Sequence, residues 1–298
     1  MLSTARAIGY SWIAHTFRAV GDRASRRAWR ILNPPPVPRP ENSRLRNIHA
    51  GQRAFVIGNG PSLASQDLSV LKGELLFTMN SFDRHPMARE LAPVYHHLAD
   101  PLLASGTPET EEMLLRIERG IGDSQIFIPA WGPTESARLR QWRSDGRLWF
   151  VPMRGSLADD PVDALEMSVR VPEVQSTSQL AIMTAIYMGC NPIYLLGLDS
   201  DWAASMNLDR HFYIEPTLNR EPGTGPKPLT YQTILECTLR LWKGYTHLRD
   251  YCEPRTIEVF NCTAGGLLDV FPRKTFDEVV SQLAEPEPGR AVPPEIGE

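Results

Sequence analysis

Short apolar runs alternate with longer mixed segments from residue 53 onward. Apolar runs of this length, bounded by turn residues, are typical of buried strands, and the segments between several of them fit helices. Alternation of strands with helices favours a mostly parallel sheet that is covered on both faces. We therefore expect an α/β fold, a single Rossmann-like domain over 51–284. The predicted strands are 54–57, 75–79, 94–98, 125–128, 148–151, 192–196 and 256–260, and the clearest predicted helices are 178–188 and 231–251.

A helical period marks the N-terminal segment. Ile13, Phe17, Val20 and Ala24 recur at spacings of four, three and four, and arginines fill the positions between them. This pattern predicts an amphipathic basic helix over 1–33, followed by a Pro-rich linker over 34–50. Such a helix suits an anionic membrane surface, but it equally suits packing on its own domain or on a second subunit.

The location of the protein is predicted from two absences in the sequence. No apolar run is long enough to span a bilayer, and arginines interrupt the N-terminal apolar stretch where a signal peptide would need an unbroken one. We expect a cytoplasmic protein, held peripherally at the inner face of the membrane if the basic helix binds lipid. The net charge of −4 gives no reason to expect a nucleic-acid partner.

Two further segments lack apolar periodicity. Residues 199–228 are polar, rich in Pro and Gly and too long for an ordinary connection, so we expect an active-site flap or lid there. Residues 285–298 are rich in Pro and Glu, and we expect a disordered acidic tail.

The first predicted strand runs into the turn Gly58-Asn59-Gly60-Pro61-Ser62. Its glycines permit backbone conformations and close approaches that a Cβ would block, and Pro61 sets a helical φ at the start of a helix. A helix beginning there would turn free N–H groups, and the Ser62 hydroxyl, toward an anion. The pattern is that of neither a dinucleotide fingerprint nor a Walker-type loop. It predicts a phosphate site, with a plain strand-turn-helix as the alternative.

This turn resembles the opening motif of the bacterial α-2,3-sialyltransferase family and of its relatives, the motility-associated flagellin glycosyltransferases and the MptE-like 6-hydroxymethylpterin pyrophosphokinase domains. Residues 75–82 are similar to the second family strand, which ends in an Asn followed two residues later by an aromatic. Residues 176–199 resemble the family's helix, its glycine end and a strand that closes in Gly-hydrophobic-Asp. The three matches occur in order and cover much of residues 53–199.

The resemblance implies a single domain with a lid that uses a CMP-activated sugar without an essential metal. It departs from the sialyltransferase pattern at Gln175, where an Arg is expected, and at Asp201-Trp202, where tyrosines are expected. The resemblance therefore does not specify sialic acid. Carried over to this chain, with Gly265 added from the glycine turn after the last strand, the nucleotide-binding residues are Gly58, Asn59, Gly60, Pro61, Ser62, Asn80, Ser81, Thr177, Ser178, Gly197, Asp199 and Gly265.

Catalytic candidates lie in the predicted flap. His211 is the expected general base, because imidazole titrates near neutral pH, and Tyr213 is expected to donate to a phosphate oxygen, as the family's lid tyrosines do. A lone loop histidine is often incidental, and that alternative stays open. His96 and His97, at the end of a predicted strand, form a second pair near the same pocket, for which we favour a structural role.

The pair Asp199 and Asp201 has the spacing of carboxylates that hold Mg²⁺ or Mn²⁺ against a nucleotide diphosphate. In the alternative interpretation Asp199 bonds the adjacent turn and Asp201 is solvated. Because the resemblance is to a metal-independent family, we expect no required cofactor, with Mg²⁺ at these two residues as the alternative.

These features together favour a glycosyltransferase of surface polysaccharide biosynthesis. It would move a sugar from a CMP-linked donor to a hydroxyl of a surface glycan or lipid-linked acceptor. Two alternatives stay open. One is Mg²⁺-dependent diphosphotransfer from ATP to a pterin alcohol, and the other is a non-catalytic module that binds a nucleotide sugar.

Overall fold

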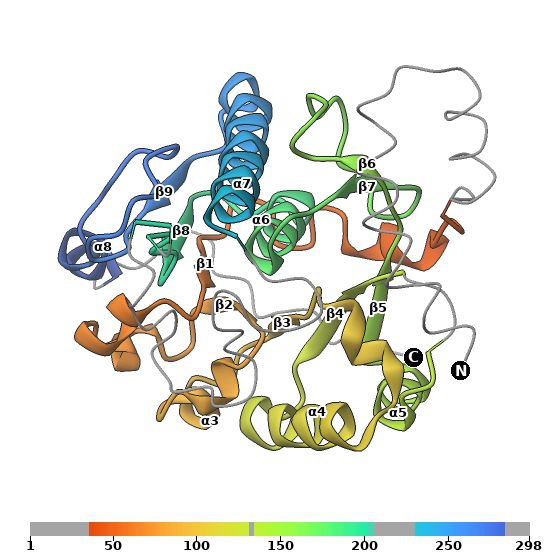
Figure 1. Ribbon diagram of the computed structural model, residues 1–298. Helices are drawn as coiled ribbons and strands as arrows, with labels where there is room; N and C mark the ends of the chain where they lie inside the picture. Colours follow the sequence, from red (N-terminus) through yellow and green to blue (C-terminus); the bar gives the residue numbers. More distant parts are fainter. Residues whose placement is uncertain (1–35, 131–133, 202, 205–229, 284–298) are drawn as a thin grey trace, which may run out of the picture.

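Seven parallel strands form the centre of the molecule in the computed structural model, which describes residues 36–130, 134–201, 203–204 and 230–283 (Figure 1). Neighbouring strands follow the order β5-β4-β3-β2-β1-β8-β9, and every pairing is parallel. The predicted α/β fold with a mostly parallel sheet is confirmed. The strands are β1 (Ala54–Ile57), β2 (Leu75–Met79), β3 (Tyr95–His97), β4 (Gln125–Pro129), β5 (Leu148–Val151), β8 (Ile193–Leu196) and β9 (Val259–Asn261).

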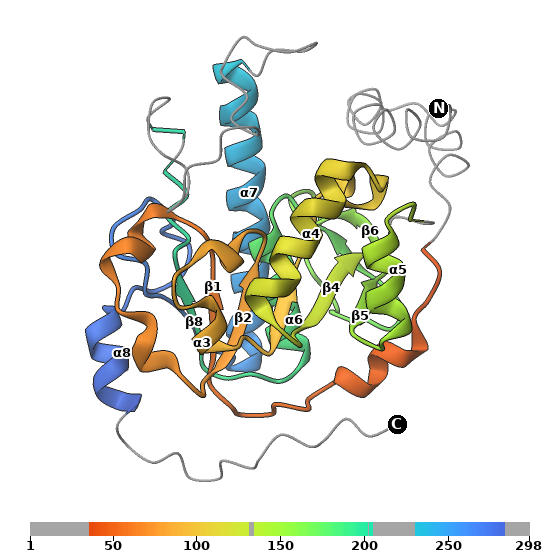
Figure 2. The same ribbon diagram turned by 90° about the horizontal axis from the view of Figure 1, so that it is seen from below.

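Helices cover both faces of the sheet, as the nearly unbroken apolar strands require. On one face α6 (Thr177–Tyr187) packs on Val56, Phe77 and Tyr95, and α7 (Tyr231–Cys252) packs against α6. All residues of α6 are buried, which explains why its sequence is apolar on every side. The other face, seen in Figure 2, carries α3 (Ala88–Leu91), α4 (Pro108–Ile121), α5 (Ala137–Ser144) and α8 (Phe276–Leu283).

Shorter elements complete the domain, and apart from a helix starting at Pro61 the sequence did not predict them. A separate two-stranded parallel sheet pairs β6 (Met153–Ser156) with β7 (Val171–Glu173). The 3₁₀ helices found among the described residues serve mostly as connections, and these are η1 (Pro40–Leu45), η2 (Pro61–Ser65), η3 (Leu68–Leu71), η4 (Phe82–Arg84), η5 (Pro101–Ser105) and η6 (Glu253–Arg255).

Part of the predicted linker over 34–50 belongs to the folded domain. Asn42 in η1 is fully buried, and its Nδ2 donates to the carbonyl oxygens of Phe150 at 2.9 Å and Met167 at 2.8 Å. The bond to Phe150 satisfies a carbonyl of β5, an edge strand of the sheet. An apolar-periodicity pattern does not reveal a segment that is anchored by one buried amide.

Several predicted segments lie outside the described residues. These are the N-terminal helix over 1–33, the acidic tail over 285–298 and most of the flap, since residues 202 and 205–229 are not described. Within the ranges that the structure does describe, no helix is both long enough and apolar enough to cross a membrane.

Candidate nucleotide site

The predicted phosphate turn lies at the switch point of the sheet, where the order in which successive strands are added reverses. The chain leaves β1 toward β2 and the strands beyond it, and it returns on the other side of β1 as β8. In open parallel sheets ligands bind in the crevice outside the carboxyl ends of the two strands at such a switch point. The turns that follow β1 and β8 are residues 58–62 and 197–199, so the fold brings together the two segments that the sequence singled out separately.

The glycines of these turns let the two backbones cross closely. Gly58 N–H donates to Leu196 O at 2.8 Å, and Gly60 N–H donates to Gly197 O at 2.9 Å. A Cβ at Gly60 would lie 2.7 Å from Gly197 O, well inside van der Waals contact. Gly197 has a φ of +62° and faces Leu63. The packing of one turn on the other is therefore enough to require glycine at these three positions.

Ser62 at the start of η2 already contacts a carboxyl group. Its N–H donates to Asp199 Oδ1 at 3.1 Å, and its hydroxyl donates to Asp199 Oδ2 at 2.8 Å. Burial raises the pKa of Asp199, the nearby Asp201 raises it further, and the bonds from Ser62 act in the opposite direction. A phosphate that bound to Ser62 would have to displace this carboxylate. The contact between Ser62 and phosphate stays a prediction, and it requires that the Asp199 side chain move away from Ser62.

Asn59, Asn80 and Thr177 connect the carboxyl ends of three strands with the start of α6. Asn59 Nδ2 donates to Met79 O at 3.0 Å, Asn80 N–H donates to His97 O at 3.0 Å, and the Thr177 hydroxyl donates to Asn80 Oδ1 at 3.0 Å. Asn80 adopts a φ of +50°, a left-handed conformation that asparagine tolerates better than most residues. Asn59 Oδ1 is buried and has no hydrogen-bond partner among the described residues.

His97, for which the sequence favoured a structural role, has one ring nitrogen that the fold leaves unused. Its Nδ1 lies 3.1 Å from Thr78 O, and because a carbonyl only accepts, Nδ1 carries the proton and Nε2 is left as an acceptor. That Nε2 is buried and unpartnered in the part of the chain described. Burial lowers the pKa of His97 to about 3, so the ring is neutral near pH 7. The ring lies between Phe77 and Phe127, with centroids 6.0 and 5.2 Å away.

His96, on the opposite face of the same strand, has the structural role that we favoured for both histidines. Its Nδ1 shares a hydrogen bond with the Thr78 hydroxyl at 2.9 Å, and its Nε2 donates to Asn80 O at 3.1 Å. Both ring nitrogens are therefore used within the fold. Adjacent strand residues point to opposite faces, so the sequence could have separated the two histidines, but nothing in it marks the unpartnered nitrogen.

Ser178 joins two helices. Its hydroxyl shares hydrogen bonds with the Tyr245 hydroxyl at 2.6 Å and with the Ser176 hydroxyl at 2.8 Å, and the residue is only 2% exposed. Of the predicted pair, Thr177 therefore faces Asn80 at the strand ends, whereas the Ser178 hydroxyl is used in the contact between α6 and α7. Ser81, another predicted contact, is buried and accepts a hydrogen bond from Arg116 Nη2 at 3.3 Å.

Gly265 lies on the far side of the Asp199 turn. The loop after β9 packs on this turn, since Leu267 N–H donates to Asp199 O at 2.7 Å and a Cβ at Gly266 would lie 2.6 Å from the same oxygen. Gly265 itself has a φ of +79° and lines a separate cavity. The structure thus places Gly265 beside the crevice rather than within its centre.

The catalytic candidates His211 and Tyr213 lie outside the described residues. Of the predicted metal pair, Asp199 bonds Ser62 as described above, and the Asp201 carbonyl accepts a hydrogen bond from Ala204 N–H at 2.8 Å. The described ranges contain no group of three or more His, Cys, Asp or Glu side chains placed to hold a metal ion.

Comparison with known proteins yields weak structural likenesses only. No protein-family model matches the chain, and no curated protein matches its sequence. The MAf glycosyltransferase of Magnetospirillum magneticum AMB-1 aligns at 15% identity and a TM-score of 0.47 over 82% of this chain, which spans only 40% of that protein. The Campylobacter jejuni sialyltransferase CstII, bound to CMP-3FNeuAc, aligns at 13% identity and a TM-score of 0.42, over 74% of this chain and 85% of that one. The same enzyme with cytidine-5′-monophosphate aligns at 14% identity and a TM-score of 0.43, over 75% and 85%. Likenesses this weak do not assign a function.

Proposed function

We propose that this chain is a glycosyltransferase that binds a nucleotide-sugar donor, CMP-linked by preference, at the carboxyl ends of β1, β2 and β3. The observation that supports it is two buried acceptors, Asn59 Oδ1 after β1 and His97 Nε2 at the end of β3, for which the described residues offer no hydrogen-bond partner. A buried polar atom left unpaired costs about 1–3 kcal/mol. Proteins retain few such atoms, and a ligand that supplies the missing hydrogen bond is one reason to retain them.

A nucleoside offers the matching donors. Ribose hydroxyls and the exocyclic amino group of cytosine carry O–H and N–H groups that Asn59 Oδ1 and His97 Nε2 would accept. The low pKa of His97 keeps Nε2 unprotonated, so it stays an acceptor over the physiological range. The motif resemblance favours CMP among the nucleotides, and Asn80 and Thr177 are the remaining polar groups expected to contact it.

In the proposed reaction an acceptor hydroxyl attacks the anomeric carbon of the donor sugar, and the bond from that carbon to the phosphate oxygen breaks. CMP leaves with the electron pair, and His211 takes the proton of the attacking hydroxyl. Tyr213 and the 58–62 turn would stabilise the charge on the departing phosphate. The acceptor would be a surface glycan or a lipid-linked one.

The alternative of diphosphotransfer from ATP places Mg²⁺ at Asp199 and Asp201. Both Asp199 oxygens accept hydrogen bonds from Ser62, so a metal would have to compete with those bonds. A non-catalytic module that binds a nucleotide sugar shares the nucleotide site and differs only in turnover. Both alternatives serve as outcomes of the test.

Thermal shift with CMP, UDP, GDP and ATP, each with and without Mg²⁺, separates these functions. Stabilisation by CMP that does not depend on Mg²⁺ supports the proposal, Mg²⁺-dependent stabilisation by ATP supports diphosphotransfer, and no response to any nucleotide refutes both. His211→Ala should then abolish sugar transfer while the CMP response is retained. If CMP binds but the wild-type chain transfers no sugar to any acceptor, the non-catalytic alternative holds.

His97→Phe tests the observation that supports the site. Phenylalanine keeps the ring between Phe77 and Phe127 but removes the acceptor nitrogen, so we expect CMP affinity to fall about tenfold. It also removes the bond from Nδ1 to Thr78 O, so the variant should lose some folded stability. His247→Phe on α7 is the matched control, because His247 Nδ1 also bonds a backbone carbonyl, that of Leu157 at 2.7 Å. An unchanged CMP dissociation constant in His97→Phe would contradict the assignment of His97.

A further inference from the structure

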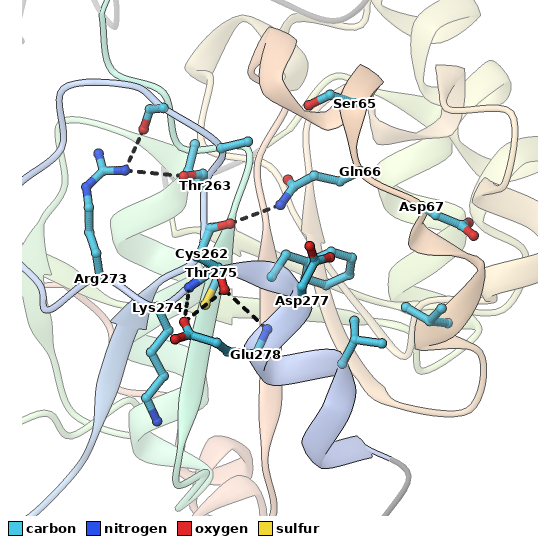
Figure 3. A pocket seen from close by; sticks show the side chains of 15 residues that line it. Ser65, Gln66, Asp67, Cys262, Thr263, Arg273, Lys274, Thr275, Asp277 and Glu278 are labelled. Atoms are coloured by element: carbon cyan, nitrogen blue, oxygen red, sulfur yellow. Dashed lines mark hydrogen bonds between the residues drawn. The ribbon is translucent and has the colours of Figure 1, made fainter.

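A cavity of about 520 Å³ lies between the η2–η3 segment and the start of α8 (Figure 3). Its volume is in the range of small-molecule sites. Figure 3 shows Gln66 and Asp67 on one wall, Cys262 and Thr263 on a second, and the residues from Arg273 to Glu278 on a third. Only Gly265 is shared with the predicted nucleotide contacts, so the cavity is a feature that the proposed donor site leaves unused.

The cavity presents hydrogen-bond acceptors. Gln66 Nε2 donates to Cys262 O at 3.0 Å, which fixes the amide and leaves its Oε1 buried with no partner in the described part of the chain. The exposed carboxylate of Asp277 lines the opposite wall (Figure 3). Asp67 also lines the cavity, and its Oδ1 accepts a hydrogen bond from Ser69 N–H at 2.9 Å.

The positive charges that line the cavity are already engaged. The Arg273 guanidinium donates to the carbonyl oxygens of residues 263, 265, 266 and 268, at 2.7 to 3.3 Å. Lys274 Nζ lies 3.7 Å from the centroid of the Phe260 ring. The lining sets the three carboxylates of Asp67, Asp277 and Glu278 against these two cations, so a phosphate or carboxylate ligand would meet a net negative charge. The matching ligand instead carries several O–H or N–H donors and no negative charge.

Apolar side chains complete the wall. Val70, which is 40% exposed, lines the cavity together with Phe276 and Val280. A sugar ring combines hydroxyl donors around its edge with apolar C–H groups on its faces, so it matches both the acceptors and this apolar surface. An alkyl ammonium would match the acceptors alone.

The cavity and the proposed donor crevice share two walls. Ser62 faces the crevice and Ser65, three residues later in η2, lines the cavity, a separation of about 6 Å along a 3₁₀ helix. The loop after β9 also borders both, because the Thr263 hydroxyl accepts from Leu198 N–H at 3.1 Å. An acceptor chain that reaches the donor sugar would therefore pass close to this cavity.

We propose that this cavity binds an uncharged sugar residue of the acceptor glycan. The identity of the ligand as an acceptor rests on the proposed function, whereas the preference for an uncharged, hydroxyl-rich ligand rests on the cavity alone. Gln66 Oε1 and the Asp277 carboxylate accept hydrogen bonds from sugar hydroxyls, and Val70 contacts the face of the ring.

The test uses the labelled full-length chain on an array of uncharged, sialylated and sulfated glycans, with CMP thermal shift measured on the same samples. Val70→Trp fills the cavity from an exposed position, and Asp277→Ala removes one acceptor. Asp123→Ala, which removes an exposed carboxylate between α4 and β4, is the matched control. We expect the wild type to retain uncharged glycans, Asp277→Ala to weaken retention about tenfold, Val70→Trp to abolish it and the control to leave it unchanged.

Three outcomes would overturn the proposal: no glycan retained, only anionic glycans retained, or retention that Val70→Trp and Asp277→Ala leave unchanged. The CMP response should be the same in the wild type and in all three variants, which shows that the donor site and the fold are intact. If the wild type binds glycans through the cavity but responds to no nucleotide, the proposed function fails while the cavity assignment stands.

Discussion

Gly60→Ala should destabilise the protein through Asp199. A Cβ at residue 60 would lie 2.6 Å from Asp199 Cγ and 2.7 Å from Gly197 O. Favourable contacts between carbon atoms begin near 3.5 Å, and Asp199 Oδ2 is closer still at 1.7 Å, so the Asp199 carboxyl group has to move by more than about 1 Å. The Asp199 side chain moves more easily than the Gly197 backbone, and when it moves it loses the hydrogen bonds from Ser62.

The expected cost has two parts. Overpacking of this kind costs about 1–3 kcal/mol. Hydrogen bonds to a charged group contribute about 1.5–3 kcal/mol each when buried, but Ser62 is only half-buried and water replaces part of the loss. Taking about 1.5 kcal/mol for both bonds together, we expect Gly60→Ala to reduce the free energy of unfolding by about 3 kcal/mol, which is about 6–12 °C in Tm.

A double-mutant cycle with Asp199→Ala isolates the contact. Without the Asp199 side chain, the added methyl meets only Gly197 O, so Gly60→Ala should cost about 1–1.5 kcal/mol in that background. The coupling energy is then about 1.5–2 kcal/mol, measured by urea unfolding of the four proteins. Costs that add to within about 0.5 kcal/mol, or a cost of Gly60→Ala below about 1 kcal/mol in the wild type, would refute the packing of these two turns.

Three further outcomes can be measured on the same protein. Burial raises the pKa of Asp199 in the folded state, so its contribution to stability is full below about pH 4 and is lost as the pH rises through the folded-state pKa. The stability of Asp199→Asn relative to the wild type should therefore increase as the pH rises above about 4, and a constant difference in unfolding free energy would contradict this. Tyr245→Phe should cost about 1–2 kcal/mol in urea unfolding and leave CMP affinity unchanged, since the Ser178 hydroxyl that it leaves unpaired joins α7 to α6; weaker CMP binding would place Ser178 in the site after all. Residues 34–298 should float less with anionic liposomes than the full chain if the 1–33 helix binds lipid, and equal flotation would exclude that role.

The strands were predictable because burial on both faces leaves a strong signal in the sequence. The predicted strand at 54–57 matches β1, and 75–79 matches β2, since each is an apolar run with turn residues after it. The last strand was displaced, from the predicted 256–260 to Val259–Asn261, because Thr256 and Ile257 look like strand residues but follow directly on η6. The β6–β7 pair was missed because only two of its seven residues are buried.

The location of the candidate site was predictable from the sequence, but the hydrogen-bond partners of its side chains were not. Glycine turns and strand ends mark the switch point, so the turns at 58–62 and 197–199 were found from their residue types. The hydrogen-bond partner of each polar side chain depends on residues that are far away in the sequence. Ser62 bonds Asp199 across 137 residues, and Ser178 meets Tyr245 across 67 residues. His97 was named only as a secondary candidate, because the sequence shows its residue type but not which of its nitrogens lacks a partner.

The position of β1 between β2 and β8 has a consequence for synthesis of the protein in the cell. Its register partner Leu75 follows soon after Ala54, but its other partner is Ile193, in β8. At a translation rate of about 5–20 residues per second, the ribosome needs roughly 7–28 s to reach β8 after β1 is made. Until then one edge of an apolar strand is unpaired, which invites association between nascent chains. The incomplete sheet of β1–β5 is therefore the stage at which we expect chaperone dependence, and folding should be slow because the pairing of β1 with β8 joins residues far apart in sequence.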